Sequence, residues 1–423
     1  MKKVLIITYY WPPAGGPGVQ RWLKFVKYLP HFGITPIVYI PENPNYPILD
    51  NSFVKEVPKD VIIYKHPIRE PYKLAGLFSK KDAKRISSGI ITTKNQSIIE
   101  KAMLWVRGNF FIPDARKNWV GPSVKFLDAI IDKERIDTVV TTGPPHSIHL
   151  IGNRLKELKG IRWLTDFRDP WTSIGYHKKL KLTRKSQLEH KRLEHQVLNN
   201  ADGIIVTSYT TKKEFETITD KPISVITNGF DSDDQGHAPL TKDFTISHIG
   251  SLLSGRNPLV LWKVLGELVN ENEGLKTSFK LRLAGVISED VLQTIKDSGL
   301  ENHTEILGYI SHEEAITLQQ QSQVLLLVEI DSKETRGILP GKLYEYMAAE
   351  RPILAIGPEK WDAAQIIADT HSGFSFGYSD ENELKDVLLK WFWAYKNEGL
   401  VMKSVGLEKF SRRELTKELA KHI

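Results

Sequence analysis

Short apolar runs alternate along the whole chain with longer segments in which apolar residues recur every three or four positions. The short runs are rich in Val, Ile and Leu, which is typical of strands that are buried on both faces of a parallel sheet. The longer segments have the period of helices that pack on such a sheet. This alternation predicts a parallel α/β architecture.

The first half of the chain contains a series of such strand patterns. We expect strands at residues 4–8, 34–40, 61–64, 138–142, 162–165 and 203–207, and a closing strand that begins at Ile223. Helices are predicted between several of them, for example at residues 20–31 and 182–200. Residues 85–120 show no clear period, and we interpret them as an irregular segment whose last part, residues 107–119, is an aromatic and basic loop.

A second alternation follows a polar stretch, residues 231–241, that we interpret as a linker. Its strand patterns lie at residues 244–250, 280–284, 304–307, 324–330 and 352–356. A chain of 423 residues is too long for a single core. We therefore predict two Rossmann-like parallel-sheet domains, residues 1–231 and 242–400, which face each other across a cleft lined by the carboxyl ends of their strands.

Composition places the chain among ordinary globular proteins, with 41% hydrophobic and 26% charged residues. No window has the length and apolarity of a membrane span. The sequence contains no cysteine, which excludes disulfides, cysteine-based metal sites and thiol chemistry, and fits a reducing compartment. We therefore expect a cytoplasmic protein.

The net charge of +7 favours anionic partners such as nucleotide sugars or anionic lipid head groups. Nucleic acid is not predicted as a partner, because the chain has no zinc-finger motif, no aromatic RNA-binding signature and no long basic tail. Residues 73–85 mix apolar and basic side chains. They are either a peripheral contact with the inner membrane surface or a solvated helix or loop.

The most informative motif of the chain is Pro340-Gly-Lys-Leu-Tyr-Glu-Tyr-Met-Ala-Ala-Glu-Arg-Pro352. It lies between two predicted strands, so a helix that begins at Pro340 starts at the carboxyl edge of the sheet. The free amide groups and the dipole of such a helix start favour a phosphate, and Lys342 adds a full positive charge. Glu345 lies on the same face and is able to accept hydrogen bonds from a ribose diol. The alternative is a solvated ion pair between Lys342 and Glu345.

A glycine-containing loop also follows the first strand of the second half. Gly250 ends that strand, and Arg256 follows in the loop, where a guanidinium is able to bind a diphosphate through two hydrogen bonds. The alternative is that Arg256 is simply an exposed loop residue.

The first strand of the chain leads into a similar loop. Gly15, Gly16 and Gly18 permit tight turns and a close approach of the backbone to a ligand. Arg21 adds positive potential at the start of the next helix. The third glycine of a dehydrogenase fingerprint is missing, and packing alone is a common reason for glycine at this position.

Polar residues end two further strands of the first half. Thr141-Thr-Gly-Pro-Pro-His146 presents His146 at the edge of the cleft, and Asp166-Phe-Arg-Asp-Pro-Trp171 ends the next strand. Two acids and Arg168 are expensive to bury there without a purpose. Asp166 and Asp169 either pair with Arg168 structurally or bind and polarise acceptor hydroxyls. We assign Asp166, Asp169 and His146 as candidate catalytic residues.

No metal site is predicted. Asp231-Ser-Asp233 matches the Asp-x-Asp pattern of some sugar transferases, but it lies in the predicted linker. His190 and His195 are five residues apart, which differs from the four-residue spacing of helical metal ligands.

Taken together, these motifs resemble the large family 4 of retaining glycosyltransferases, which have the GT-B fold. The resemblance covers the whole chain and rests on five segments: Gly15 to Arg21, Asp166 to Trp171, Asn228-Gly-Phe-Asp231, Gly250 to Arg256, and Pro340 to Pro352. It implies that the last helix, within residues 401–423, crosses back to the first domain. It also implies transfer of a sugar from a nucleotide-diphosphate donor to a glycan or lipid-linked acceptor, with retention of configuration and without a metal or other cofactor.

The resemblance also assigns roles to residues of each domain. The first domain would bind the acceptor, and the second the donor, through Gly250, Ser251, Arg256, Leu339, Pro340, Gly341, Lys342, Leu343 and Glu345. Arg256 and Lys342 would neutralise the diphosphate and stabilise the leaving group, and Glu345 would hold the ribose. Such enzymes commonly act in the synthesis of cell-surface polysaccharide or lipopolysaccharide.

One position departs from the family pattern. The family has a second glutamate eight residues before Glu345, where this chain has Gly337. Glu329, Asp331 and Glu334 lie upstream and are able to replace it. The alternatives to a transferase are a nucleotide-sugar epimerase or hydrolase on the same fold and a non-catalytic nucleotide-binding relative.

Overall fold

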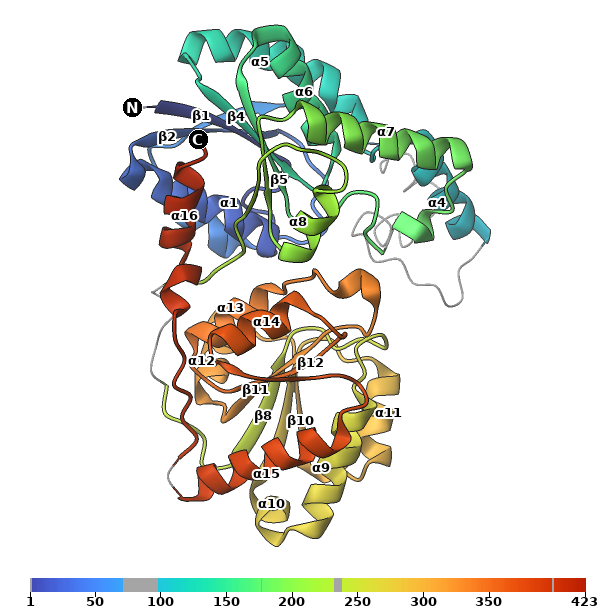
Figure 1. The fold of residues 1–423 in the computed structure, drawn as a ribbon, viewed down its shortest axis with the longest axis vertical. Coiled ribbons are helices and arrows are strands. Elements are labelled where there is room, and N and C mark those ends of the chain that lie inside the picture. Colours follow the sequence, from blue (N-terminus) through green and yellow to red (C-terminus); the bar gives the residue numbers. More distant parts are fainter. Residues whose placement is uncertain (1, 71–97, 176, 232–237, 398) are drawn as a thin grey trace. The chain divides into compact units, whose positions relative to one another are not determined.

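The computed structural model describes residues 2–70, 98–175, 177–231, 238–397 and 399–423. The chain divides into two compact units, which are drawn in Figure 1. Unit 1 contains Met1–Thr227 and Arg412–Ile423, and unit 2 contains Asn228–Ser411. The first unit thus ends before the predicted linker at residues 231–241. Residues 73–85 and Asp233 lie outside the described part of the chain.

Unit 1 is built on a seven-stranded parallel sheet with the strand order β3-β2-β1-β4-β5-β6-β7. The strands are β1 (Lys2–Thr8), β2 (Ile34–Pro41), β3 (Ile62–His66), β4 (Thr138–Gly143), β5 (Arg162–Phe167), β6 (Gly203–Val206) and β7 (Ile223–Val225). The order reverses between β1 and β4, which creates a switch point at the carboxyl edge of the sheet.

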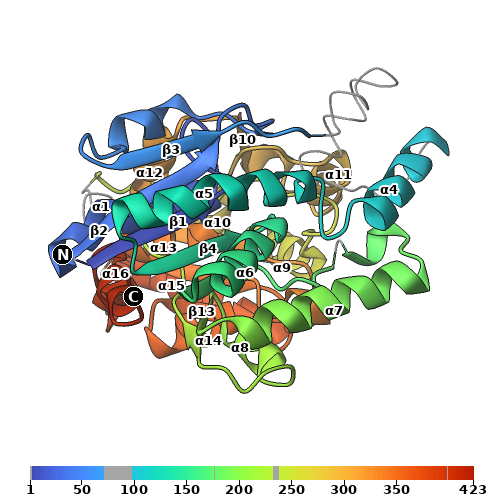
Figure 2. The ribbon, with the colours of Figure 1, turned by 90° about the horizontal axis from the view of Figure 1, so that it is seen from above.

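Helices cover both faces of this sheet (Figures 1 and 2). Val4 and Ile6 of β1 belong to one core, and Leu5 and Ile7 belong to another, as expected for a strand that is buried on both sides. The first core contains residues of α1 (Pro17–Tyr28), η1 (Leu29–Phe32), η2 (Asn51–Glu56) and α16 (Arg412–Ala420). The second contains residues of η3 (Lys117–Trp119), α5 (Val120–Glu134), α6 (Ser147–Lys159), α7 (Arg184–Asn200) and α8 (Tyr209–Phe215).

The C-terminal helix α16 returns to unit 1, which confirms the predicted crossing of the last helix. Leu415, Leu419 and Ile423 pack into the same core as α1. Arg412 donates a hydrogen bond from Nη2 to Oε1 of Gln20 at 2.7 Å. A segment that follows unit 2 in sequence is therefore part of the core of unit 1.

Unit 2 repeats the plan with a six-stranded parallel sheet in the order β10-β9-β8-β11-β12-β13. The strands are β8 (Phe244–Ile249), β9 (Phe279–Ala284), β10 (Thr304–Gly308), β11 (Val324–Val328), β12 (Ile353–Ile356) and β13 (Gly373–Phe376). The order reverses between β8 and β11. The predicted fold class, two parallel α/β sheets, is confirmed.

Two cores flank the sheet of unit 2. One contains residues of α9 (Leu259–Glu271), α10 (Glu273–Ser278), α11 (Glu289–Asp297) and α15 (Glu381–Asn397). The other contains residues of α13 (Gly341–Ala348), α14 (Asp362–Asp369) and η8 (Leu407–Phe410). The remaining elements are η6 (Glu301–His303), α12 (His312–Gln321) and η7 (Lys333–Thr335).

The sequence missed two elements. Strand β13 is short, begins with glycine and has two exposed residues, so it lacks the long apolar run of the other strands. The interpretation of residues 85–120 as irregular was wrong for α4 (Ile98–Phe110). Leu104 of α4 is buried beside Leu180 of η4 (His177–Leu180), whereas Trp105, Val106 and Phe110 are exposed. Apolar residues on both sides of this helix obscure its period.

Among the helices that the structure describes, none has the length and apolarity that a membrane crossing requires.

Replacing Leu419 by Ala is expected to lower the free energy of unfolding of unit 1 by about 2–5 kcal/mol, because Leu419 is fully buried and its truncation leaves a cavity. Urea denaturation followed by tryptophan fluorescence measures the change. Lys417→Ala is the matched control on the same helix, since Lys417 is exposed and forms only a surface ion pair. Equal stability of the two variants would show that α16 is not part of the core.

Candidate functional site

The carboxyl edge of the unit-2 sheet gathers most of the predicted donor-binding residues at its switch point. His248 lies in β8, Gly250 follows that strand, and Glu329 follows β11, the neighbour of β8 in the sheet. Helix α13, the next helix after β11, carries Lys342. Ligands of open α/β sheets bind in the crevice at such a switch point.

Helix α13 begins as the sequence predicts. Pro340 is its N-cap, with φ −63° and ψ 140°, and Gly341 and Lys342 form the first turn. No side chain caps this end, and the amide of Leu343 donates to the carbonyl of Pro340 at 3.0 Å. The first amides of a helix have no partner within the helix, and they favour an anion.

The ammonium group of Lys342 lies over the backbone of Gly250. A Cβ atom on Gly250, which has φ +126°, would be only 2.8 Å from Nζ of Lys342. Nζ is also 3.3 Å from Nε2 of the buried His248, whose Nδ1 lies 2.9 Å from the carbonyl oxygen of Leu326. Because that carbonyl only accepts, Nδ1 carries the proton of the neutral ring and Nε2 accepts from Lys342. Burial and the charge of Lys342 lower the pKa of His248 well below its usual value, which agrees with a neutral ring.

The environment of Lys342 lowers its pKa to about 8. Burial is the largest cause, and the nearby guanidinium of Arg256 adds to it. The carboxylates of Glu329 and Glu345 act in the opposite direction. Lys342 is therefore mostly charged at pH 7, and an anionic ligand would stabilise that form.

Arg256 forms a two-point ion pair with Glu329. Its Nε and Nη2 each donate to the carboxylate at 3.1 Å, and the shortest distance, from Nη2 to Oε1, is 2.9 Å. The side chain of Glu329 is 1% exposed, whereas that of Arg256 is 30% exposed. The amide of Ile330 also donates to Oε1 of Glu329 at 2.8 Å. Arg256 is thus held in place and remains in contact with solvent.

Two further predicted residues lie at this edge. Glu345 is half-buried on α13, and its Oε2 accepts a hydrogen bond from Nε2 of the buried Gln319 at 3.0 Å. Ser251 is exposed directly after Gly250.

The side chains of Leu339 and Leu343 do not fit their predicted place among the donor-binding residues. Both belong to the core that α13 forms with its sheet, at 9% and 0% exposure. A helix that lies on a sheet must bury one face, and Leu343 occupies it. Leu339 precedes the N-cap Pro340 and packs into the same core.

In unit 1, the structure overturns the ligand-binding roles expected for Asp166 and Arg21. Asp166 is fully buried in β5, where it accepts hydrogen bonds from Nη2 of Arg21, Nε1 of Trp22 and Oγ1 of Thr142 at 2.7–2.8 Å. The side chain of Arg21 is only 1% exposed. The structural partner of Asp166 is therefore Arg21, and not Arg168 as in the structural alternative considered from the sequence. Neither Arg21 nor Asp166 is exposed to a ligand.

Arg168 instead packs against the first glycine loop. A side chain on Gly18 would overlap its guanidinium, whose Nε and Nη2 donate to the carbonyl groups of Gly143 and Pro144. The guanidinium also lies 5.7 Å from the ring centroid of Tyr10.

The other two glycines of this loop serve the turn itself. Gly16 has φ +103°, a value that side chains disfavour. Gly15 packs against Ile48, where a Cβ atom would lie 2.9 Å from Cγ2. Packing and backbone conformation are therefore sufficient reasons for these glycines.

Asp169 differs from Asp166. It is only half-buried, and within the described residues its carboxylate accepts no hydrogen bond. Burial raises its pKa, and the charge of Arg168 opposes that shift. The assignment of Asp169 as a candidate catalytic residue remains a prediction.

His146 is 4% exposed and stacks on Trp171, with ring centroids 4.9 Å apart and planes 4° from parallel. Both of its ring nitrogens lack a partner within the described residues. Burial and the neighbouring His149 lower its pKa well below the usual value, so the ring is neutral. Its catalytic role remains a prediction.

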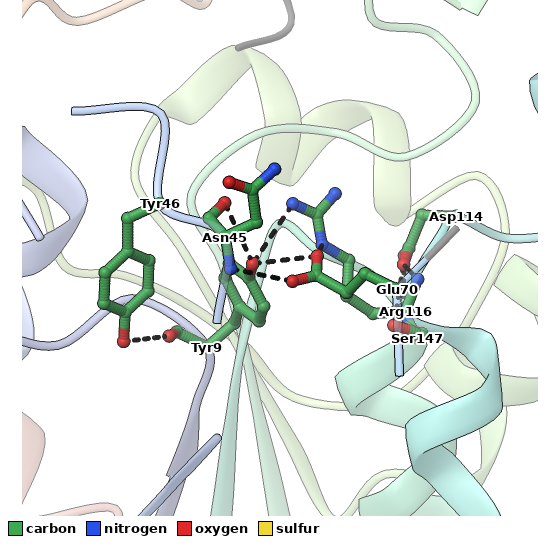
Figure 3. A network of polar contacts seen from close by, with 7 residues as sticks. All are labelled: Tyr9, Asn45, Tyr46, Glu70, Asp114, Arg116 and Ser147. Atoms are coloured by element: carbon green, nitrogen blue, oxygen red, sulfur yellow. Dashed lines mark hydrogen bonds and ion pairs between the residues drawn. The ribbon is translucent and has the colours of Figure 1, made fainter. Parts of the chain in front are cut away.

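A polar network that the sequence did not indicate lies beside β1 (Figure 3). Arg116 and Glu70 form a buried ion pair, with 3.0 Å between Nε and Oε1. The hydroxyl of Tyr9 donates to the same carboxylate oxygen at 2.9 Å, and the amide of Asn45 donates to the other at 2.8 Å. The hydroxyl of Tyr46 donates to the carbonyl of Tyr9 at 3.0 Å.

The same network reaches the start of α6 (Figure 3). Asp114 accepts hydrogen bonds from the amide of Arg116 and from the amide and hydroxyl of Ser147, each at 2.8 Å. Loops that are far apart in the sequence are thus fixed around the end of β1. No local pattern signals this network, because each residue finds its partners only in the folded chain.

Among the described residues, no group of three or more His, Asp or Glu side chains is arranged to hold a metal ion.

Two family models match consecutive parts of the chain. The model described as Glycosyltransferase Family 4 matches residues 90–234, and the one described as Glycosyl transferases group 1 matches residues 243–392. Together they span more than two thirds of the chain. None of the curated proteins matches the sequence.

Solved structures share the arrangement of the whole chain. A glycosyltransferase from Rickettsia africae is 16% identical, with a TM-score of 0.59 over 99% of this chain and 93% of its own. The Anabaena protein Alr3699/HepE, solved in complex with UDP-glucose, is 13% identical. Its TM-score is 0.61, and the match covers 100% of this chain and 99% of the Anabaena chain. The lipopolysaccharide outer core galactosyltransferase WaaB is also 13% identical. Its TM-score is 0.58, and the match covers 100% of this chain and 99% of the WaaB chain. At these identities the likeness concerns the fold alone, which is GT-B.

Replacing Asp166 by Asn is expected to destabilise unit 1 by about 3–5 kcal/mol, because the buried charge of Arg21 loses its counter-ion. Asp169→Asn is the matched control and should change the stability by less than about 1 kcal/mol, since the carboxylate of Asp169 accepts no hydrogen bond from the described residues. Urea denaturation of both variants measures the difference. A stable Asp166→Asn protein would show that the buried ion pair is not a structural requirement.

Proposed function

The chain belongs to the family 4 type of GT-B glycosyltransferases, and we propose that it transfers a sugar from a nucleotide-diphosphate donor to a hydroxyl of a glycan or lipid-linked acceptor. We place this reaction in the synthesis of cell-surface polysaccharide or lipopolysaccharide. Donor binding is assigned to unit 2 and acceptor binding to unit 1.

One observation carries this proposal: Arg256 and Lys342 meet at the amide-rich start of α13, at the switch point of the unit-2 sheet. Two cations and a helix start suit the two phosphates of a nucleotide sugar. During transfer, the bond between the anomeric carbon and the phosphate oxygen breaks, and negative charge develops on the leaving diphosphate. Fixed positive charges stabilise that transition state more than the ground state.

Glu345 is assigned to bind the ribose of the donor nucleotide. Its carboxylate lies one turn after Lys342 and is held by Gln319. A carboxylate in that position is able to accept two hydrogen bonds from a ribose diol.

Metal independence and retention complete the proposal. Arg256 and Lys342 supply the positive charge that a metal ion would otherwise bring to the diphosphate. Retention follows from the family resemblance, with the acceptor attacking the face from which the diphosphate leaves. Turnover in the presence of EDTA tests the first point, and the configuration of the anomeric proton in the product tests the second.

A lipid-linked acceptor is supported by one surface of unit 1. Trp105, Val106 and Phe110 of α4 are 42%, 42% and 59% exposed, and the exposed Lys101 lies on the same helix. Aromatic and basic side chains together favour the interface of an anionic bilayer. We propose that α4 makes a peripheral membrane contact. Residues 73–85, for which such a contact was one of two interpretations, lie outside the described residues.

Lys342→Ala is expected to weaken the binding of the nucleoside diphosphate by roughly 10- to 150-fold, because one charge-assisted contact contributes about 1.5–3 kcal/mol. Calorimetry with UDP, GDP and ADP measures the dissociation constants. Lys296→Ala is the control, since Lys296 is exposed on α11 and, among the described residues, forms an ion pair with Glu301 alone. If none of the three nucleotides binds the wild-type protein, the proposed function fails.

Assays with a nucleotide sugar separate the transferase from its alternatives. A transferase releases nucleotide only when an acceptor is added, whereas a hydrolase releases it in water alone. An epimerase changes the sugar without releasing nucleotide.

The double substitution Trp105→Ser and Phe110→Ser is expected to weaken binding to phosphatidylglycerol-containing vesicles by about tenfold or more, because two aromatic side chains no longer enter the bilayer. Vesicle co-sedimentation measures the partition. Leu158→Ser is the control, since Leu158 is 63% exposed on α6 but lies outside this surface. Unchanged partition of the double variant would contradict a membrane contact through α4.

A further inference from the structure

Glu329 is a buried carboxylate inside the cluster to which we assign phosphate binding. A negative charge close to a phosphate costs electrostatic energy, because like charges repel more strongly where water is excluded. Its presence at the switch point therefore requires a compensating function. The contacts of Glu329 indicate what that function is.

We propose that Glu329 is the positioning residue of the donor site: its carboxylate fixes the guanidinium of Arg256 in the orientation that binds diphosphate, and it supplies the negative charge beside Lys342. This inference rests on the proposed function and adds to it a role for a residue outside the predicted donor-binding set. It also gives one of the acidic residues upstream of Gly337 a function other than contact with the donor sugar.

The geometry of the ion pair leaves one side of Arg256 for a ligand. Nε and Nη2 both donate to Glu329. Nη1 makes no hydrogen bond within the part of the chain that the structure describes, and the side chain is 30% exposed. A guanidinium that is held along one edge loses little further side-chain entropy when its remaining amino group binds a phosphate.

Both the carboxylate and the backbone of Glu329 are held by further hydrogen bonds. The amide of Ile330 donates to its Oε1, and the hydroxyl of Tyr378 donates to the backbone carbonyl of Glu329 at 2.9 Å. Burial raises the pKa of Tyr378, so its hydroxyl stays protonated. The support of Arg256 is thus rigid.

The charge of Glu329 also favours the protonated form of Lys342. The ionisable groups around Lys342 are His248 in β8, Arg256 in the loop before α9, Glu329 after β11 and Glu345 on α13 itself. His248 is neutral, and Arg256 repels the ammonium. Of the two carboxylates, only Glu329 is enclosed, and its influence on the pKa of Lys342 is the larger.

A different role, in which Arg256 leaves Glu329 to bind the donor, is disfavoured by burial. Its departure would separate a carboxylate that is 1% exposed from the cation that pairs with it. Breaking one partner away from a buried ion pair is strongly unfavourable. Arg256 is therefore expected to keep Glu329 as its partner when the donor binds.

The test is calorimetry between pH 6.5 and 9 with whichever of UDP, GDP and ADP binds the wild-type protein most tightly. Wild-type affinity should fall above pH 8, because the diphosphate binds the ammonium form of Lys342 and binding then requires proton uptake. In Glu329→Gln the side chain keeps its shape but loses its charge. The pKa of Lys342 then falls further, and the loss of affinity begins at a lower pH.

The ratio of the dissociation constants of Glu329→Gln and the wild type should therefore increase across this range, by about tenfold for each unit by which the pKa of Lys342 falls in the variant. The ionisation of the ligand is common to both proteins and cancels in the ratio. Glu329→Asp restores the charge and should return the pH profile toward that of the wild type. Asp297→Asn removes an exposed carboxylate of α11 that is not among the groups acting on Lys342, and it should leave the profile unchanged.

The Lys342→Arg variant tests whether Lys342 is the group whose titration changes the affinity. Arginine stays charged throughout this range, so the loss of affinity near pH 8 should disappear and Glu329→Gln should then have a pH-independent effect. With Lys342 in place, a ratio that does not change with pH would contradict the action of Glu329 on Lys342, and an unchanged dissociation constant in Glu329→Gln would contradict the positioning of Arg256. Neither result would affect the proposal of donor binding. Failure of the wild type to bind any nucleotide would instead reject the proposed function.

Discussion

The ion pair between Arg256 and Glu329 is the interaction on which the arrangement of the charged residues at the carboxyl edge of the unit-2 sheet depends. A parallel sheet whose strand order reverses leaves a crevice at its carboxyl edge. Charges in that crevice are partly removed from water, so each needs a partner. Glu329 satisfies this requirement for Arg256 and partly for Lys342, and the start of α13 is left open to an anion.

Unit 1 uses the same chemistry for a different purpose. Arg21 and Asp166 also form an ion pair at a sheet edge, but both side chains are enclosed, at 1% and 0% exposure. Trp22 and Thr142 saturate the carboxylate. The two pairs therefore differ in the exposure of the cation: Arg256 is accessible to a ligand, and Arg21 is not.

Individual misassignments have identifiable physical causes. The short strand β13 and the helix α4 were missed because one has few buried residues and the other has apolar residues on both sides. Arg21 and Asp166 have the residue types and positions of ligand-binding groups, and only their mutual contact removes them from that set. Glu329 and His248 were not assigned to the site, because their contacts with Arg256 and Lys342 join residues that lie 73 and 94 positions apart.

The sequence by itself determined the alternation of strands and helices, the two-sheet architecture, the start of α13 at Pro340 and the cationic residues Arg256 and Lys342. These properties are local, since they depend on hydrophobic period, on the geometry of proline and on charge near a helix start. Tertiary structure decided which charges are paired, which are enclosed and which remain accessible. Those outcomes depend on strand order and on burial, and neither can be derived from the neighbours of a residue in the chain.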